Sequence, residues 1–417
     1  MPIDKLGESW YNNPVSSREI ALLHGFFWKR RCAVIYADHA ATTAVSPAAI
    51  AAMIPYLDTV YGNPSSPHLF GQRAKAALED ARSRIAHCLH ADAKEIYFTS
   101  GGSEADNQAL RTAAMIGAAN GKRHIVSAAF EHHAVLHTLD ALVREGFTVT
   151  LLPVPEDGIL PAADVAAALR EDTALVSVMY ANNEIGTVQP AAEIGAVCRK
   201  RGVLFHTDAV QAAGHLPLDV QADCIDLLAI SAHKFHGPKG IGVLYARRGI
   251  TPQPLIFGGG QERGRRAGTE NVPAIMGMAA ALEEATAHLP ENTVRLTALR
   301  DRIIAGLRAI PQSCLNGDAV RRLPANIHFS FAGIEGESLL MLLDSRGICA
   351  SAGSACASGS TEPSHVLTAI GRSRALANGS LRLSIGEECT EADADCIVQN
   401  VQEIVSYLRE AAHWNEN

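Results

Sequence analysis

The sequence is poor in cysteine and contains no long apolar run. Its nine cysteines in 417 residues form no CxxC pair and no regular spacing, which excludes a disulfide framework or a zinc ribbon. No apolar stretch approaches the roughly 18 residues that span a bilayer. The 36 basic residues are outnumbered by 44 acidic ones and form no stripe that could bind nucleic acid. These absences predict a cytoplasmic protein that binds neither a membrane nor nucleic acid.

The chain does have material for a sizeable core, because 47% of its residues are hydrophobic. At about 150 residues per domain, its length predicts two or three domains, or one large domain with an appendage. Residues 1–33 are the one candidate for a targeting segment. Their apolar patch precedes a basic triplet at 29–31 instead of following it, which is the wrong order for a signal peptide. We interpret residues 1–33 as an N-terminal extension, for which three explanations stay open: a disordered segment, a docking segment or an upstream choice of start codon.

Strand-like and helix-like stretches alternate through the middle of the chain. The expected strands are apolar almost throughout and lie at 95–99, 124–127, 147–152, 174–179, 203–207 and 226–230. Between them, helical patterns occur at 103–119, 132–145 and 191–200. Strands that are apolar on both faces and joined by helices indicate a parallel sheet covered on both sides. Residues 44–290 are therefore predicted to form one large α/β domain with a mostly parallel sheet.

The last third of the chain has a different character. Two separate helices are expected at 273–288 and 292–310, and a shorter mixed region follows and ends in a helix at 391–412. We predict that residues 291–417, together with 34–43, form a smaller α+β domain.

A first informative strand end lies at residues 99–107. Gly102 and Ser103 stand at the start of a helix, where backbone N–H groups and the positive end of the helix dipole can bind a phosphate. The alternative is an ordinary glycine turn, with Ser103 as the N-cap and Asp106 in the first turn.

Two further strand ends carry Asp208 and Lys234. Asp208 places a carboxylate at the edge of the sheet where ligands bind, although it could instead cap the next helix. Lys234 directly follows a buried strand, where desolvation favours the free amine needed for Schiff-base chemistry. The alternative is a surface loop, which suits Lys239. A lysine, an acid and an anion pocket are together the requirements of pyridoxal phosphate.

Seven segments of the sequence resemble those of the cysteine desulfurases. These are pyridoxal-phosphate enzymes of fold type I that supply sulfur for iron–sulfur clusters. The segments are DHAATT at 38–43, GNPSS at 62–66, TSGGSE at 99–104, NNEIG at 182–186, SAHK at 231–234, RRAGTEN at 265–271 and SAC at 354–356. The resemblance runs from about residue 34 to about residue 408. It is greatest to the nitrogen-fixation and housekeeping branch, because Cys356 sits in a long loop of small and polar residues.

The resemblance implies roles at the cofactor, pyridoxal 5'-phosphate. Lys234 would be the Schiff-base lysine, and Asp208 would pair with the pyridinium nitrogen. His132 would stack on the ring and move protons, whereas the neighbouring His133 has no implied role. The other residues implied to bind the cofactor are Gln211 and Asn183 at the ring oxygen, and Gly102, Ser103, Ser231 and His233 at the phosphate.

The resemblance also implies how substrate and sulfur are handled. Arg382 would clamp the carboxylate of L-cysteine, with Asn183 beside the substrate. The Cys356 thiolate would attack the substrate sulfur, leaving L-alanine and a protein persulfide that passes to an acceptor such as an iron–sulfur cluster scaffold. Thr269 would reach the phosphate of the other subunit, which implies a homodimer. No metal is expected.

Several positions depart from the family pattern. Ser103 stands where relatives often have Thr, Ala232 replaces a Gly, and residues 1–33 have no counterpart. The tail with which some relatives hold the scaffold is curtailed after Trp414. The remaining cysteines are interpreted as small buried hydrophobic residues: Cys32, Cys88, Cys198, Cys224, Cys314, Cys349, Cys389 and Cys396.

Two alternative functions stay open. A selenocysteine lyase or an aminotransferase of the same fold type would share Lys234, Asp208 and Arg382. Cys356 argues against an aminotransferase but does not separate sulfur from selenium chemistry. A different class would be a non-catalytic metal-thiol protein, whose ligands would be His206, His215, Cys224, His233 and His236. Their spacings match no regular zinc pattern.

Overall fold

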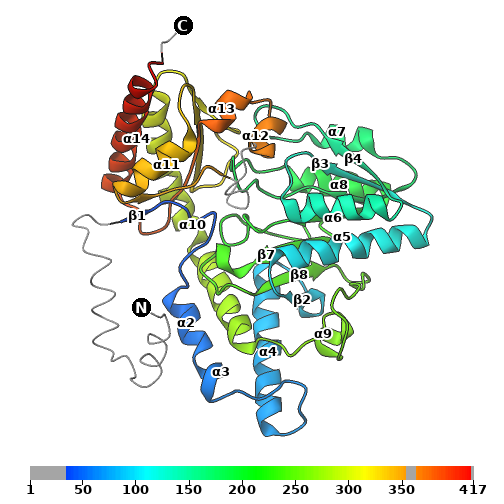
Figure 1. Cartoon of the computed structure of the whole chain (residues 1–417). Coiled ribbons are helices and arrows are strands. Elements are labelled where there is room, and N and C mark those ends of the chain that lie inside the picture. The colour runs from blue at the N-terminus through cyan, green and yellow to red at the C-terminus, as the bar shows by residue number, and fades with distance from the viewer. Residues whose placement is uncertain (1–33, 354–362, 415–417) are drawn as a thin grey trace, which may run out of the picture.

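The computed structural model describes residues 34–353 and 363–414, and its centre is a seven-stranded sheet of order β2-β8-β7-β6-β5-β3-β4 (Figure 1). Strand β8 is antiparallel to both of its neighbours, and every other pairing is parallel. The mostly parallel sheet predicted from the sequence is therefore confirmed. Its strands are β2 (Ile96–Thr99), β3 (His124–Ala128), β4 (Thr148–Leu152), β5 (Thr173–Ser177), β6 (Leu204–Asp208), β7 (Leu227–Ser231) and β8 (Gly242–Ala246).

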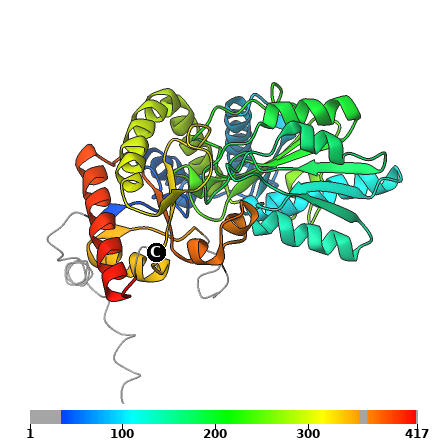
Figure 2. The same ribbon diagram turned by 90° about the horizontal axis from the view of Figure 1, so that it is seen from above.

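Helices cover both faces of this sheet, as the apolar strands require (Figure 2). Neighbouring residues of β3 show the two faces: Val126 belongs to the hydrophobic cluster that includes α4 and α8, whereas Ile125 belongs to the cluster of α5 and α6. The helices of this part are α2 (Pro47–Met53), α3 (Pro55–Asp58), α4 (Leu69–Cys88), α5 (Gly102–Ala119), α6 (His133–Arg144), α7 (Ala162–Ala168), α8 (Ala191–Arg201) and α9 (Gln261–Gly264). The short 3-10 helices are η1 (Ala93–Glu95) and η2 (Ala232–Lys234).

A second hydrophobic core is built around an antiparallel sheet of order β12-β10-β9. Ala37, from the beginning of the described chain, packs into this core, and its neighbour β1 pairs in parallel with β11. The proposed division at residues 290/291 stays a prediction. The elements here are β1 (Ile35–Tyr36), β9 (Ser313–Leu315), β10 (Asn326–Phe331), α11 (Gly336–Ser345), β11 (Ile348–Cys349), α12 (His365–Ala369), α13 (Arg374–Asn378), β12 (Ser380–Ser384) and α14 (Glu391–Ala411).

One long helix, α10 (Val272–Arg308), connects the two cores. The sequence predicted two helices here, and that prediction is wrong, because α10 continues through Pro290. A proline inside a helix removes one hydrogen bond and crowds the preceding turn. Packing on both sides compensates: Leu282 is buried in the large core and Leu296 in the smaller one. Tertiary packing therefore overrides the local signal for a break.

Two sequence predictions fall outside the described residues, namely the extension at 1–33 and the cysteines Cys32 and Cys356. Of the other cysteines, Cys198 and Cys389 are buried as predicted, whereas Cys396 is exposed on α14, so its predicted burial is wrong. The partly exposed cysteines are Cys88, Cys224, Cys314 and Cys349. None of the helices in the described part of the chain has the length and apolar character needed to cross a membrane.

Candidate active site

A cavity of about 300 Å³ lies at the carboxyl ends of the parallel strands, the place where such sheets bind ligands. Its wall brings together the described residues that the sequence analysis selected, with one exception. They are Gly102, Ser103, His132, Asn183, Asp208, Gln211, Ser231, His233, Lys234 and Arg382. The exception is Thr269, which is exposed and does not line the cavity of its own chain.

Lys234 is held against the segment between β1 and α2. Its Nζ atom donates to the carbonyl oxygens of Ala40 at 2.6 Å and Ala41 at 2.8 Å. Its own carbonyl lies 2.9 Å from Nε2 of His215. Lys239, the alternative lysine, is exposed and lies outside the cavity wall.

Asp208 is a buried carboxyl group at the end of β6. One oxygen accepts a hydrogen bond of 2.9 Å from the backbone N–H of Val210. Burial, reinforced by the nearby charge of Asp106, raises the pKa of Asp208. A buried carboxyl group of this kind is stably ionised only beside a cation, and a protonated pyridine nitrogen would meet that need.

The start of α5 supplies an anion-binding surface. Gly101 is the N-cap and makes no side-chain cap bond, so the prediction of Ser103 as the N-cap is wrong, since Ser103 is the second helical residue. A Cβ atom at Gly102 would lie 2.6 Å from Val210 Cγ2 and 3.6 Å from Ser231 Cβ. Ser231 therefore lies next to the helix start, where backbone N–H groups favour a phosphate.

Three histidines stand along one side of the cavity. His132 is the N-cap of α6, and its Nδ1 accepts from the backbone N–H of Ala134 at 3.1 Å. Burial lowers the pKa of His132. His133, to which no role was assigned, also lines the cavity, and its ring centroid lies 4.6 Å from that of His365. No motif in the sequence marks His365, which reaches the cavity only through the fold.

Arg382 comes from the other sheet, on β12, and is 2% exposed. Its Nη2 atom bonds Asp38 Oδ1 at 2.9 Å, and its Nη1 atom donates to the carbonyls of Asn183 at 3.0 Å and Gly353 at 2.8 Å. Its Nε atom has no hydrogen-bond partner within the described chain. These contacts use three of the five N–H donors of the guanidinium, fix it in the cavity wall and leave two donors for a ligand.

Two buried acids that the sequence analysis did not select as site residues lie at or near the cavity. Asp106, assigned only to a helix turn, lines the cavity, and burial raises its pKa to about 8. Glu131 accepts from the backbone N–H of Met179 at 2.8 Å, and burial raises its pKa well above the ordinary value. The expectation that Asp106 lies in the first turn is wrong, because Asp106 is the fifth residue of α5, and a polar residue inside a helix gave too little signal to select it. In the described ranges, no group of three or more His, Cys, Asp or Glu side chains could hold a metal ion.

The aminotransferase class-V family model matches residues 35–397, and the chain belongs to this family. Its relatives place it among the cysteine desulfurases. The cysteine desulfurase IscS of Clostridium botulinum strain Hall is 50% identical over 379 residues, which are 90% of this chain and 95% of the relative. The cysteine desulfurase IscS of Methanosarcina thermophila is 51% identical over 375 residues, 90% of this chain and 93% of the relative.

A solved structure agrees with the fold and with the family. A NifS-like protein superposes with a TM-score of 0.84 at 38% identity, covering 90% of this chain and 100% of its own. The α/β fold with a large, mostly parallel sheet that the sequence analysis expected is therefore confirmed, and it is the fold of the class-V aminotransferases.

Proposed function

We propose that this protein is a cysteine desulfurase that converts L-cysteine to L-alanine and carries the sulfur as a persulfide on Cys356. One observation carries the proposal: a single cavity joins Lys234 and Asp208, from the large sheet, to Arg382, from the smaller one. An amine, a buried acid and a guanidinium are what a pyridoxal-phosphate enzyme needs for an amino-acid substrate. Identity of about half to named cysteine desulfurases supports the sulfur chemistry.

The residues present fit pyridoxal phosphate. Lys234 would bind it covalently, and Asp208, whose pKa is raised by burial, would face its pyridine nitrogen. The phosphate would lie at the start of α5, with Gln211 and Asn183 at the ring oxygen. The residues that would hold the phosphate are Gly102, Ser103, Ser231 and His233. When bound, the cofactor supplies an electron sink for bonds at the carbons of the amino acid.

Side chains of this protein would bind the substrate and transfer protons to and from it. Arg382 binds the carboxylate, because its guanidinium is already oriented by two carbonyls and by Asp38. His132 would lie at the cofactor ring, and because burial lowers its pKa, its neutral form is favoured and can accept a proton. The amine of Lys234 is the second group that accepts and returns protons in the cavity.

Cys356 takes the sulfur. Its thiolate forms a sulfur–sulfur bond as the carbon–sulfur bond of the substrate breaks, and the released carbon takes up a proton to give L-alanine. Cys356 belongs to segment 354–362, which lies outside the described residues, but both flanks of that segment reach the cavity. Gly353 and His365 line it, and Ser364 Oγ bonds Glu184 Oε2 at 2.5 Å.

We also propose a cytoplasmic homodimer that passes sulfur to an acceptor protein such as an iron–sulfur cluster scaffold. Thr269 supports the homodimer, because it is exposed and outside the cavity wall of its own chain, as expected of a residue that reaches the site of a second subunit. Exposed apolar side chains, including Phe257 and Tyr61, supply surface that a second subunit could cover.

A product assay tests this function. The purified chain, supplied with pyridoxal phosphate, L-cysteine and a reducing thiol, should release alanine and sulfide in equal amounts. Parallel reactions with L-selenocysteine measure the selenium alternative. Formation of a keto acid in place of alanine would support an aminotransferase and contradict the proposal.

A further inference from the structure

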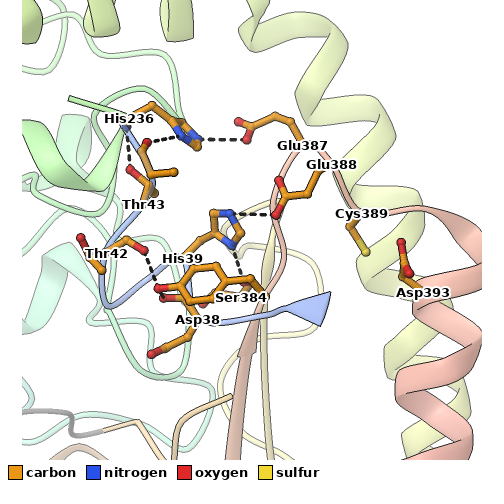
Figure 3. A network of polar contacts seen from close by, with 12 residues as sticks. Asp38, His39, Thr42, Thr43, His236, Ser384, Glu387, Glu388, Cys389 and Asp393 are labelled. Atoms are coloured by element: carbon orange, nitrogen blue, oxygen red, sulfur yellow. Dashed lines mark hydrogen bonds and ion pairs between the residues drawn. The ribbon is translucent and has the colours of Figure 1, made fainter. Parts of the chain in front are cut away.

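Two neighbouring glutamates each bind a histidine from a distant part of the chain (Figure 3). Glu387 Oε2 lies 3.0 Å from Nε2 of His236. Glu388 Oε1 lies 3.2 Å from Nε2 of His39. The two histidine rings are themselves neighbours, with centroids 6.1 Å apart. The four side chains therefore form one acid–imidazole cluster, here called the double clamp, outside the cavity.

His236 is held in an unusual backbone conformation. Its φ angle is 64°, in the left-handed region that residues other than glycine seldom adopt. Its N–H donates to Thr43 Oγ1 at 2.8 Å, its carbonyl accepts from the N–H of Ser46 at 2.9 Å, and its Nδ1 contacts the carbonyl of Ala44 at 3.0 Å. Strain of this kind persists only where surrounding contacts enforce it, and such positions cluster near functional sites.

Each contact of the double clamp restrains a backbone segment that touches Lys234. His236 follows Lys234 by two residues in the same loop. His39 directly precedes the carbonyls that accept hydrogen bonds from the Lys234 amine. His39 Nδ1 also contacts the carbonyl of Ser384, the last residue of β12.

The acidic side of the double clamp belongs to the segment that carries Arg382. Glu387 and Glu388 lie shortly after the end of β12, the strand that carries Arg382. The backbone of this segment is fixed in turn by Arg295, whose guanidinium donates to the carbonyls of Glu387 and Cys389. The double clamp therefore bridges the two walls of the cavity from behind.

We infer that Glu387 and His236, with Glu388 and His39, are positioning residues that fix Lys234 relative to Arg382. The inference rests on the proposed function, in which Lys234 holds the cofactor and Arg382 binds the substrate carboxylate. Tight binding of an amino acid needs both groups at one separation, because the carboxylate and the amino group are engaged together. A loosened clamp should weaken amino-acid binding more than it slows turnover.

The charges of the clamp set a pH range for this effect. Burial opposes ionisation of both partners, but their contact outweighs it, raising the pKa of His236 and lowering that of Glu387 to about 2. Glu388, His39 and His215 also face this pair. The ion pair is complete above the ordinary glutamate range and is lost as pH rises through the raised pKa of His236.

The test compares Glu387→Gln with Glu391→Gln, a matched control whose exposed carboxylate contacts only Arg302 among the ion pairs of the described chain. Two quantities are measured on cofactor-loaded protein: KM and kcat for L-cysteine, and the dissociation constant of L-alanine from the change in absorbance. Glu387→Gln should raise KM and the alanine dissociation constant about fivefold or more and change kcat little. The control should match the wild type.

A second variant removes the same contact from the histidine side, so that the test does not depend on one variant folding correctly. Asparagine tolerates left-handed backbone better than most residues, so His236→Asn removes the contact with Glu387 at little backbone cost. It should reproduce the weaker alanine binding and abolish its alkaline pH dependence.

Wild-type alanine affinity in either variant would overturn the inference. A wild-type chain that binds L-alanine but releases no sulfide would refute the proposed function instead, and the alanine comparison would still decide the role of the clamp.

Discussion

Asp106 Oδ1 lies 3.4 Å from Nε2 of His206, and both side chains are buried. Neither atom has a hydrogen-bond partner in the residues that the structure describes. His206 precedes Asp208 by two positions on β6, so both side chains project from the same face of the strand. Burial raises the pKa of Asp106 to about 8 and lowers that of His206 to about 4. At neutral pH, we therefore expect an uncharged pair beside the carboxylate that would hold the cofactor ring.

Replacing Asp106 by Asn should make the protein more stable in a pH-dependent way. Between the ordinary aspartate range near 4 and the folded-state pKa of about 8, the native protein binds a proton that the unfolded chain has released. Wild-type stability therefore falls as pH rises through this range, whereas the amide does not titrate.

Thermal melting of both proteins between pH 4 and pH 9 measures this effect. The stability difference between Asp106→Asn and the wild type should increase up to about pH 8 and then stay constant. The exposed substitution Asp140→Asn should show no such trend. A pH-independent difference between Asp106→Asn and the wild type would mean that Asp106 is ionised in the folded protein.

Lys234 should be the residue that binds pyridoxal phosphate covalently. Lys234 lines the cavity, whereas Lys239 is exposed and does not belong to the cavity lining. Borohydride reduction of the loaded protein, followed by peptide mapping, should place the label on Lys234, and Lys234→Ala should carry none. A label on Lys239 would contradict the assignment.

Arg382→Lys should weaken substrate binding and reduce stability. An ammonium group cannot reproduce the planar contacts with Asp38 and with the carbonyls of Asn183 and Gly353. Loss of buried hydrogen bonds to a charged group costs about 2 kcal/mol of unfolding free energy. KM for L-cysteine should rise about tenfold, which corresponds to about 1.4 kcal/mol.

Steady-state kinetics and thermal melting check both effects. The control is Arg302→Lys, where an exposed pair with Asp395 should contribute little. An unchanged KM in Arg382→Lys would show that another group binds the carboxylate.

The large sheet and the centre of the site could be predicted because their signals are local. Apolar strands separated by amphipathic helices predict a parallel sheet. Asp208 ends one such strand, and Lys234 lies at the end of the short 3-10 helix that follows another. Once the sheet is known, the carboxyl ends of its strands must meet at one edge, and the cavity follows.

Other features depend on contacts between segments far apart in sequence, which local patterns do not encode. The sequence analysis expected two helices at 273–288 and 292–310, yet packing against two cores keeps α10 continuous through Pro290. His236 and Glu387 look like ordinary loop and surface residues until the fold brings them together. Asp106 was visible only as a helix-turn residue, because its burial depends on the sheet beneath it.

Replacing Cys356 by Ser tests the proposed sulfur transfer most directly. A hydroxyl group is scarcely ionised near neutral pH, so it cannot take sulfur from the substrate as a thiolate does. Cys356→Ser should still bind pyridoxal phosphate at Lys234 and change its absorbance with L-cysteine, but release almost no alanine or sulfide. The control Cys396→Ser, at an exposed cysteine of α14, should behave like the wild type.

The decisive measurement is the mass of the Cys356 peptide after wild-type protein has been treated with L-cysteine, read together with alanine release by Cys356→Ser. We predict a gain of one sulfur atom on that peptide, removable by a reducing thiol, and almost no alanine from the variant. An unmodified Cys356 peptide, with near-normal alanine release by Cys356→Ser, would contradict the persulfide mechanism.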